Sequence, residues 1–137
     1  MYRIDDRSLS RYTPWVKKVV VVDDDDDMRE LMCMLLRGRY EVSEANDGAK
    51  GLDIVRAVRP DVLVLDLLMP IMHGFEVCKR LRADPELKGT KILISSSKSY
   101  QHDVRTAVEE TGADSYIVKP FEVADFNRAV DEMAGGA

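Results

Sequence analysis

Short apolar runs alternate with helical patterns along most of this chain, and this alternation constrains its fold more than any other feature. The runs are rich in Val and Ile and end in polar or turn residues. They cover Val19–Val22, Tyr40–Ser43, Val62–Leu65, Ile92–Ile94 and Tyr116–Val118. Such runs are typical of strands that are buried on both faces of a parallel sheet. We therefore expect five parallel strands.

Between and after these runs, apolar residues recur at the spacing of an α-helix. The five stripes are Met28, Leu31, Met32 and Leu35; Ala49, Leu52 and Val55; Phe75, Cys78 and Leu81; Val104, Ala107, Val108 and Thr111; and Val123, Phe126, Val130 and Met133. Parallel strands need crossover connections, which helices can supply. The sequence therefore predicts a doubly wound α/β domain, a three-layer sandwich of five strands and five helices.

The remaining segments are expected to lie outside this domain. Residues 1–17 are polar and show no periodicity, so we predict a mostly mobile N-terminal extension with Trp15 partly docked. The domain itself is predicted to cover residues 18–133, and residues 134–137 a flexible tail. A length of 137 residues allows one domain with a substantial core.

Composition narrows the class of protein. The net charge of −5 argues against non-specific nucleic-acid binding, which needs a basic surface. No apolar stretch is long enough to span a membrane, and the N-terminus does not resemble a secretory signal. Cys33 and Cys78 lie far apart in the sequence and are expected to be buried thiols. We therefore expect a cytoplasmic protein.

Polar side chains follow four of the five predicted strands. Asp23 and Asp24 follow the first, Asp66 the third, Ser95–Ser97 the fourth and Lys119 the fifth. Ligands of open parallel sheets bind beyond the carboxyl ends of the strands. We therefore expect three acids, a hydroxyl group and one ammonium group to converge at one edge of the sheet.

The run of five aspartates that follows the first strand has two interpretations. Aspartates before a helix often cap its N-terminus, and we assign this role to Asp25, Asp26 and Asp27. Asp23 and Asp24, which lie nearest the strand, can point at the site instead. Three clustered carboxylates repel one another unless a divalent cation neutralises them, and oxygen ligands favour Mg²⁺ or Mn²⁺.

Taken singly, Asp66 could cap a turn and Lys119 could be an ordinary surface lysine. Together with a metal ion and a hydroxyl group, however, they would surround a tetrahedral dianion with positive charge and hydrogen-bond donors. Phosphoryl transfer needs this positioning and charge neutralisation. An aspartate can also accept a phosphoryl group directly and form an acyl phosphate.

Four motifs occur in order along the chain: VVVVDD at 19–24, DLLMPIMHG at 66–74, RLRADPEL at 80–87 and GADSYIVKPF at 112–121. Through them the chain resembles a response-regulator receiver domain of two-component signalling, of the stand-alone chemotaxis type, from Lys18 to about Met133. The resemblance implies a flavodoxin-like fold with strand order 2-1-3-4-5.

The resemblance also implies a role for each site residue. Asp66 would be the phosphoacceptor. Asp24 would bind Mg²⁺ directly and Asp23 mainly through water, and the backbone carbonyl of Leu68 would complete the protein ligands. Lys119 would pair with the phosphoryl oxygens.

Two further positions, an aromatic residue and a hydroxyl, belong to the predicted switch. Tyr116 matches an aromatic residue that turns inward on phosphorylation, and the Lys119–Pro120 bond is often cis in this family. The switch hydroxyl is Ser96 if residues are counted from RADPEL, or Ser97 if they are counted back from Lys119. We select Ser96, because Ile92–Ile94 then align with the fourth strand.

Two positions bear on the activity that we expect. His73 stands where the family has an aspartate, and we expect activity to survive because this position is outside the chemistry. The resemblance implies that Leu68 lines the path of the attacking water. An apolar side chain cannot orient that water, so we predict slow self-dephosphorylation. In the first helix, Arg29 and Met32 could influence the choice of kinase, but a solvated-face role for Arg29 and a core role for Met32 are the simpler expectations.

Among the function classes considered, a phosphorylation switch fits best. It would receive its phosphoryl group from a histidine kinase or a histidine phosphotransfer protein, and act as a monomer or weak dimer on a downstream protein. It would contact neither nucleic acid nor membrane, and would catalyse only its own phosphorylation and dephosphorylation.

Three alternatives remain. A hydrolase with an aspartate nucleophile would need a covering segment for which the chain has no room. A degenerate receiver would bind partners without phosphorylation. Receivers often precede an output domain, but only AGGA follows Met133, so this alternative requires the chain to be the N-terminal fragment of a longer DNA-binding or enzymatic regulator.

Overall fold

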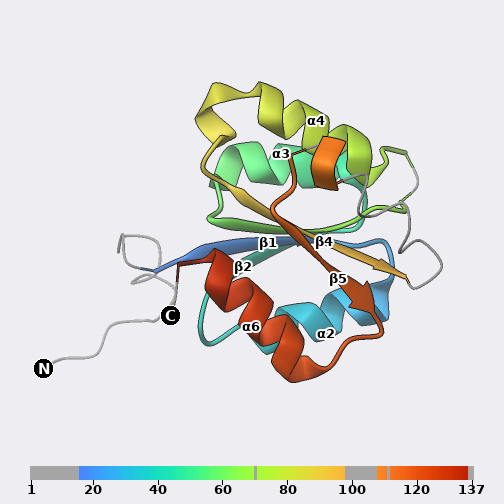
Figure 1. Ribbon diagram of the computed structural model, residues 1–137, viewed down its shortest axis with the longest axis vertical. Coiled ribbons are helices and arrows are strands. Elements are labelled where there is room, and N and C mark those ends of the chain that lie inside the picture. The colour runs from blue at the N-terminus through green and yellow to red at the C-terminus, as the bar shows by residue number, and fades with distance from the viewer. Residues whose placement is uncertain (1–15, 70, 98–107, 111, 136–137) are drawn as a thin grey trace, which may run out of the picture.

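The computed structural model describes residues 16–69, 71–97, 108–110 and 112–135. Its strands form one parallel sheet of order β2-β1-β3-β4-β5, which confirms the predicted order (Figure 1). The strands are β1 (Lys18–Val22), β2 (Glu41–Ala45), β3 (Val62–Asp66), β4 (Lys91–Ser97) and β5 (Ser115–Lys119). The predictions for the N-terminal extension with Trp15, for Val104, Ala107 and Thr111, and for the last two residues of the tail lie outside the described residues.

Helices cover both faces of the sheet and make the predicted three layers. The helices α3 (Gly48–Val58) and α4 (Gly74–Ala83) lie on one face, and α2 (Asp26–Leu36) and α6 (Val123–Met133) on the other (Figure 1). A short 3₁₀ helix, η1 (Pro85–Leu87), follows α4, and residues 108–110 are also helical. None of the described helices is long and apolar enough to cross a membrane.

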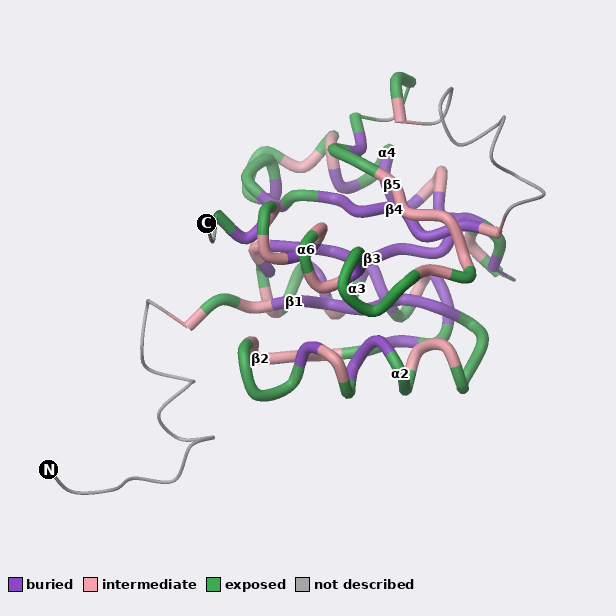
Figure 2. The backbone as a smooth tube through the Cα atoms, turned by 60° about the horizontal axis from the view of Figure 1, so that its bottom comes forward, coloured by how far each residue is buried: buried purple, intermediate pink, exposed green. Residues whose placement is uncertain are grey.

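The alternation of side chains along the strands produces two apolar cores. Val20 and Val22 face α3 and α4, whereas Val19 and Val21 face α2 and α6. The inner strands are consequently buried over almost their whole length (Figure 2). Both free cysteines are buried, as predicted, Cys33 on the α2 side and Cys78 on the α4 side.

Three strands exceed their predicted limits by a single residue at one or both ends, and two differ by more. The second was expected at Tyr40–Ser43 but runs from Glu41 to Ala45. Tyr40 lies outside it and donates its hydroxyl hydrogen to Asp131 of α6. The fourth was expected at Ile92–Ile94 but extends through its serines to Ser97, because these residues pair with β5 in the parallel ladder.

Close backbone contact fixes the connection between β3 and α4. A Cβ atom on Gly74 would lie 2.6 Å from the carbonyl oxygen of Asp66, which is closer than such atoms approach in proteins. The amide of Gly74 also donates to the carbonyl of Leu67 at 3.1 Å. The first turn of α4 is therefore held directly against the carboxyl end of β3, where the predicted site begins.

Candidate functional site

The carboxylates of Asp23, Asp24 and Asp66 meet at the carboxyl edge of the sheet. One oxygen from each lies within 4.8 Å of the others. Strands β1 and β3 are neighbours with Val22 opposite Leu65, so the residues that follow them emerge side by side. The structure thus brings together the three acids that the sequence placed at this edge.

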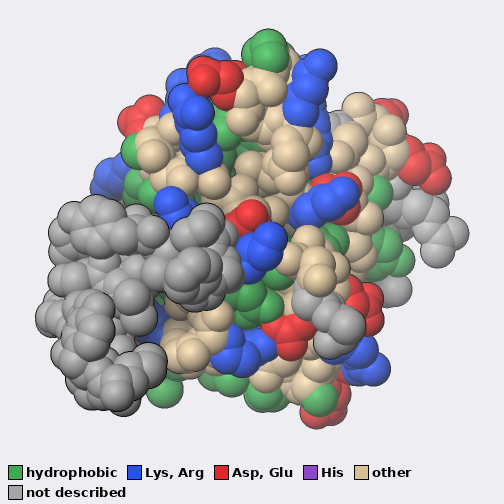
Figure 3. All heavy atoms as spheres, turned by 90° about the vertical axis from the view of Figure 1, so that its left-hand side faces the viewer, with side chains coloured by type: hydrophobic (Ala, Val, Ile, Leu, Met, Phe, Trp, Pro, Cys, Tyr) green, Lys and Arg blue, Asp and Glu red, His purple; other side chains and the backbone are tan. Residues whose placement is uncertain are grey.

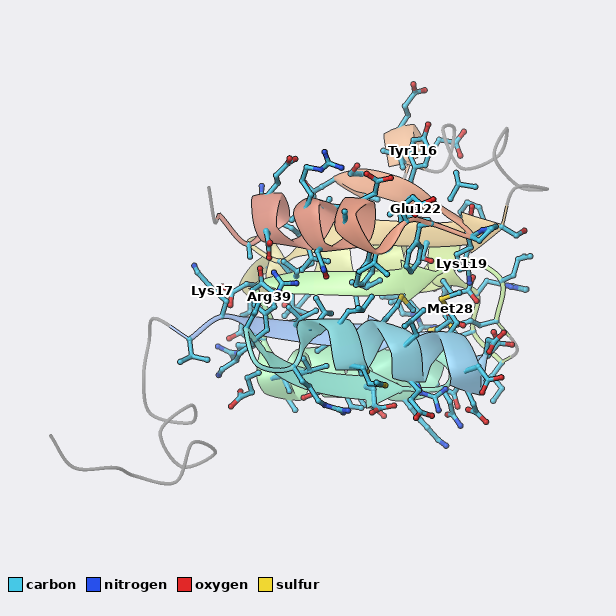
Figure 4. All side chains as sticks on the ribbon, turned by 90° about the horizontal axis from the view of Figure 1, so that it is seen from below. Lys17, Met28, Arg39, Tyr116, Lys119 and Glu122 are labelled. Carbon is cyan, nitrogen blue, oxygen red and sulfur yellow. The ribbon has the colours of Figure 1, made fainter. Side chains whose placement is uncertain are left out.

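Lys119 enters the same cluster from the end of β5. Its Nζ lies 3.1 Å from Oδ2 of Asp23 and 3.8 Å from Oδ2 of Asp66. Figure 4 shows Lys119 and Met28, at the start of α2, at one end of the sheet and Lys17 and Arg39 at the other. The peptide bond from Lys119 to Pro120 is cis.

Asp66 lies in an environment that disfavours its charge. The residue is 6% exposed. Burial, followed by the negative charge of Asp23, raises the pKa of Asp66 to about 7, although the Lys119 ammonium and the Leu68 amide act in the opposite direction. A carboxyl group with this pKa is partly protonated near neutral pH. A divalent cation bound here would favour its ionised form.

Asp23 and Asp24 differ in their access to such a cation. Asp23 is fully buried, and its Oδ1 accepts from the Asp25 amide at 2.9 Å while its Oδ2 accepts from Lys119. Asp24 is exposed. Direct coordination therefore requires less rearrangement at Asp24 than at Asp23. The all-oxygen donor set fits Mg²⁺ or Mn²⁺.

Of the remaining aspartates of the run, all three of which were predicted to cap α2, only Asp25 does so. Asp25 is the N-cap residue, and its Oδ1 accepts from the amide of Met28 at 3.1 Å. Asp26 and Asp27 lie in the first turn, where negative charge interacts favourably with the helix dipole. At α4 the corresponding position is His73, which is exposed and makes no side-chain capping bond.

The serines at the end of β4 point in alternating directions. Ser96 shares its face with Ile92 and Ile94, is 2% exposed, and donates weakly to the carbonyl of Ser97 at 3.4 Å. Ser97 is half-buried and pairs with Lys119 in the ladder. The Oγ of Ser95 is buried and has no hydrogen-bond partner among the described residues.

Two other predicted residues lie at the margins of the site. Tyr116 is partly buried and packs against the core on the α3 and α4 side. Leu68 is 39% exposed, and its amide donates to Oδ1 of Asp66 at 3.2 Å. The switch roles of Ser96 and Tyr116 and the ligand role of the Leu68 carbonyl stay predictions.

The solvated-face expectation for Arg29 is wrong. Its side chain is only 15% exposed, and its guanidinium donates to the backbone carbonyl of Asp23 and to the carboxylates of Asp26 and Glu44. The spacing of Asp26 and Arg29 on α2 could have indicated the contact between these two residues. The expected core role of Met32 is confirmed, since it is fully buried.

Comparison with known proteins identifies the family that shares this arrangement. The family described as "Response regulator receiver domain" matches residues 19–131. The DNA-binding response regulator MtrA of Mycobacterium tuberculosis is 40% identical over 107 residues, which are 77% of this chain and 45% of MtrA. The chain thus spans about half the length of the curated relatives it matches.

Solved structures show the same likeness. The chemotaxis response regulator CheY4 of Vibrio cholerae has a TM-score of 0.79 and 30% identity, with 86% of this chain and 98% of CheY4 covered. The receiver domain of the sensor histidine kinase PA1611 of Pseudomonas aeruginosa has a TM-score of 0.79 and 22% identity, with 88% and 99% covered. That structure has a magnesium ion coordinated in its active-site cleft.

Proposed function

Because this chain belongs to the response regulator receiver domain family of two-component signalling, we propose that it is a phosphorylation switch with Asp66 as its phosphoacceptor. The cluster at Asp66 carries the proposal. Two further carboxylates lie within 4.8 Å, and the only ammonium group found there among the described residues belongs to Lys119. The phosphoryl donor is a histidine kinase or a histidine phosphotransfer protein.

In the transfer step, a carboxylate oxygen of Asp66 forms a bond to phosphorus as the bond from phosphorus to the donor imidazole breaks. The electron pair of that bond returns to the imidazole, which takes up a proton. Lys119, whose Nζ is 3.8 Å from Oδ2 of Asp66, pairs with the incoming phosphoryl oxygens. The product is an acyl phosphate on the protein, so the chain acts on itself rather than as an enzyme on a separate substrate.

The residues also fit a divalent cation. Asp24, Asp66 and the backbone carbonyl of Leu68 would hold Mg²⁺ directly, and Asp23 mainly through water. The bound ion supplies positive charge that offsets the repulsion between the phosphoryl oxygens and the carboxylates. It also favours the ionised form of Asp66, which is the nucleophilic form.

The switch itself lies on the β4 and β5 side of the site. Ser96 lies two positions beyond Ile94 on the same face of β4, and Tyr116 is Ile94's partner on β5. A phosphoryl group that hydrogen-bonds to the Ser96 hydroxyl would draw this part of the sheet inward, and Tyr116 with it. The binding of a downstream protein would change as a result, in the cytoplasm and without direct contact to nucleic acid.

A second candidate is favoured by the curated relatives. MtrA is a DNA-binding response regulator, and this chain matches less than half of its length. The same switch could therefore control a DNA-binding domain in a longer protein. Size determination of the protein from its native source, with antibodies to this chain, distinguishes the two forms.

The test of the primary function is intact-protein mass spectrometry after incubation with acetyl phosphate and Mg²⁺. We expect one phosphoryl adduct on the wild type, and none on Asp66→Ala or in the presence of EDTA. Asp53→Ala is the matched control, because Asp53 is an exposed acid on α3, remote from the cluster. No adduct on the folded wild type would contradict the switch and indicate a degenerate receiver.

A further inference from the structure

We propose that Arg29 is a positioning residue of the metal site, which holds the loop after β1 so that Asp23 and Asp24 stay turned toward Asp66. The inference rests on the proposed function, because it assigns to that same site a residue outside the acidic cluster. Arg29 touches neither the phosphoacceptor nor the predicted cation. It acts through the backbone of Asp23.

The guanidinium of Arg29 joins three separate parts of the fold. Its Nη1 donates to the carbonyl oxygen of Asp23 at 2.8 Å, at the point where β1 ends. Its Nη2 donates to Oδ1 of Asp26 at 2.7 Å in the first turn of α2, and its Nε to Oε1 of Glu44 at 2.8 Å on β2. The loop from β1 to α2 is thus bound at both of its ends by one side chain.

The contacts of Asp23 restrict the positions of the two predicted metal ligands, Asp23 and Asp24. The amide of Asp23 donates to the carbonyl of Ala45 at 3.2 Å, and its carbonyl accepts from Arg29, so both of its backbone polar groups are fixed. Its carboxylate is fixed as well, by the Asp25 amide and by Lys119. Asp24 follows in the chain and takes its direction from this anchored residue.

The charge of Arg29 is offset by its own partners. Two carboxylates, those of Asp26 and Glu44, contact the guanidinium directly. The hydrogen bond from Arg29 holds the pKa of Glu44 below its usual range. Repulsion of a metal cation by Arg29 is therefore weakened, and what remains specific to this side chain is the geometry of its three bonds. An ammonium group cannot reproduce that planar fork.

A neighbouring arginine provides a matched control. Arg37 also lies beside α2 and donates to Glu44, through Nη2 to Oε2 at 3.0 Å. Its side chain is 54% exposed, and among the described residues it hydrogen-bonds only to Glu44. Substitution of Arg37 thus removes an ion pair with the same glutamate but leaves the Asp23 carbonyl bound.

The experiment measures Mn²⁺ binding to the full chain from the loss of the free-ion electron paramagnetic resonance signal, without a phosphodonor. We expect Arg29→Lys to raise the Kd for Mn²⁺ about tenfold, as for other residues that orient metal ligands. Arg37→Lys should change the Kd by less than about twofold. Thermal unfolding in EDTA provides a stability readout for each variant.

The possible outcomes separate three roles for Arg29. Weaker binding in both Arg29→Lys and Arg29→Met supports positioning. An unchanged Kd in Arg29→Lys with tighter binding in Arg29→Met shows that only the charge matters, and overturns the proposal. A lower unfolding midpoint with an unchanged Kd shows a merely structural role, and also overturns it.

Two further results keep the test decisive. If the Arg29 variants do not fold, Glu44→Gln removes the charge that anchors Arg29 from β2 and should raise the Kd about threefold, and an unchanged Kd overturns the proposal. If the folded wild type does not bind Mn²⁺, the metal site of the proposed function fails together with this inference. If the wild type binds and Arg29→Lys binds equally well, this inference alone fails.

Discussion

The two edges of the sheet treat their carboxylates in opposite ways. At the amino edge, Asp61 accepts from the Lys18 amide at 2.8 Å, and Asp114 accepts from the Ile92 amide at 2.8 Å and from Arg82 at 2.9 Å. Charged side chains of both signs are mixed on this side of the molecule (Figure 3). At the carboxyl edge, the described residues offer three clustered carboxylates a single ammonium group, that of Lys119.

The difference separates stability from function. A carboxylate with donors of its own contributes to folding, whereas a crowded and partly buried one is costly until a ligand neutralises it. Perturbed acids of the second kind are typical of functional sites. The amino edge therefore stabilises the domain, and the carboxyl edge keeps an excess of negative charge that a bound cation would neutralise.

The largest expected effect is a loss of stability when the donor Arg82 is removed from the amino edge. Arg82 donates to the carbonyls of Thr90 and Gly112 and to Asp114, and it is mostly buried. Arg82→Ala should lower the free energy of unfolding by about 2–4 kcal/mol, because these acceptors lose their donor. Urea denaturation measures the change.

Arg80 on the same helix is the control for that prediction. Its side chain is half exposed and, within the described part of the chain, pairs only with Glu76. Arg80→Ala should change the free energy of unfolding by less than about 0.5 kcal/mol. Equal losses in the two variants would contradict a special role of the amino edge.

The next effect concerns the buried charge at the carboxyl edge. The native pKa of Asp66, about 7, lies above its ordinary value of 3.8, so the native state binds this proton more tightly than the unfolded chain does. Stability must therefore fall as pH rises from about 4 to about 7 and change little above that. Asp66→Asn cannot ionise and escapes this loss.

For each pH we take the free energy of unfolding of Asp66→Asn minus that of the wild type, both in EDTA. This difference should be about 1–3 kcal/mol larger at pH 8 than at pH 4. Urea denaturation at both pH values measures this, and Asp24→Asn, which changes an exposed acid, should show a smaller difference. Added Mg²⁺ should stabilise the wild type and not Asp66→Asn. Parallel pH profiles for Asp66→Asn and wild type would show that the Asp66 pKa is not raised.

A third prediction concerns the apolar rim of the same edge. Leu68→Asn introduces a side chain that can hydrogen-bond a water molecule next to the acyl phosphate. One such bond is worth about 1 kcal/mol, so the phosphorylated protein should lose its phosphoryl group about fivefold faster. Mass spectrometry after removal of the donor gives the lifetime. Leu68→Met is the control, and an unchanged lifetime in Leu68→Asn would rule out this explanation of slow dephosphorylation.

A substitution of Ser95 tests whether every polar group at the carboxyl edge is functional. Its buried hydroxyl has no partner among the described residues, which costs free energy in the folded state. Ser95→Ala should raise the free energy of unfolding by about 1 kcal/mol and leave phosphorylation unchanged. Ser96→Ala, in contrast, should alter the proposed change in partner binding on phosphorylation. Loss of phosphorylation in Ser95→Ala would assign Ser95 to the site.

The smallest effect is expected at the start of α4. His73 occupies the N-cap position without a capping bond. His73→Asp should raise the free energy of unfolding by about 0.5–1 kcal/mol, because an aspartate can accept from the free amides of the first turn. Thermal unfolding is the measurement. Lower stability would mean that a further carboxylate near the acidic cluster outweighs the cap.

The periodicity of the sequence was sufficient for the layers and the strand-end acids, because burial and the direction of parallel strands are local consequences of the pattern. It could not reveal contacts that depend on strand register. Glu44 reaches Arg29 only because β2 lies beside β1 with Glu44 opposite Val21. The acceptors of Arg82 at Thr90, Gly112 and Asp114 likewise belong to segments that meet only in the folded chain.

The position of the switch hydroxyl could not be fixed from the local pattern either. Counting along the chain left Ser96 and Ser97 as alternatives, because residues between the strands can be added without changing either pattern. The ladder pairs Ser96 with Val118 and Ser97 with Lys119. The choice of Ser96 as the switch hydroxyl stays a prediction.

The contact between Lys119 and Asp23 joins residues that are 96 positions apart in the chain. During synthesis β1 leaves the ribosome early and β5 last, although both contribute to one cluster. Among the described residues, Lys119 of β5 supplies the ammonium group of this cluster, so the acids lack that partner until β5 docks. Under the proposed function, a nascent chain or a chain truncated before β5 should therefore not transmit a signal. Only a molecule with a complete sheet should do so.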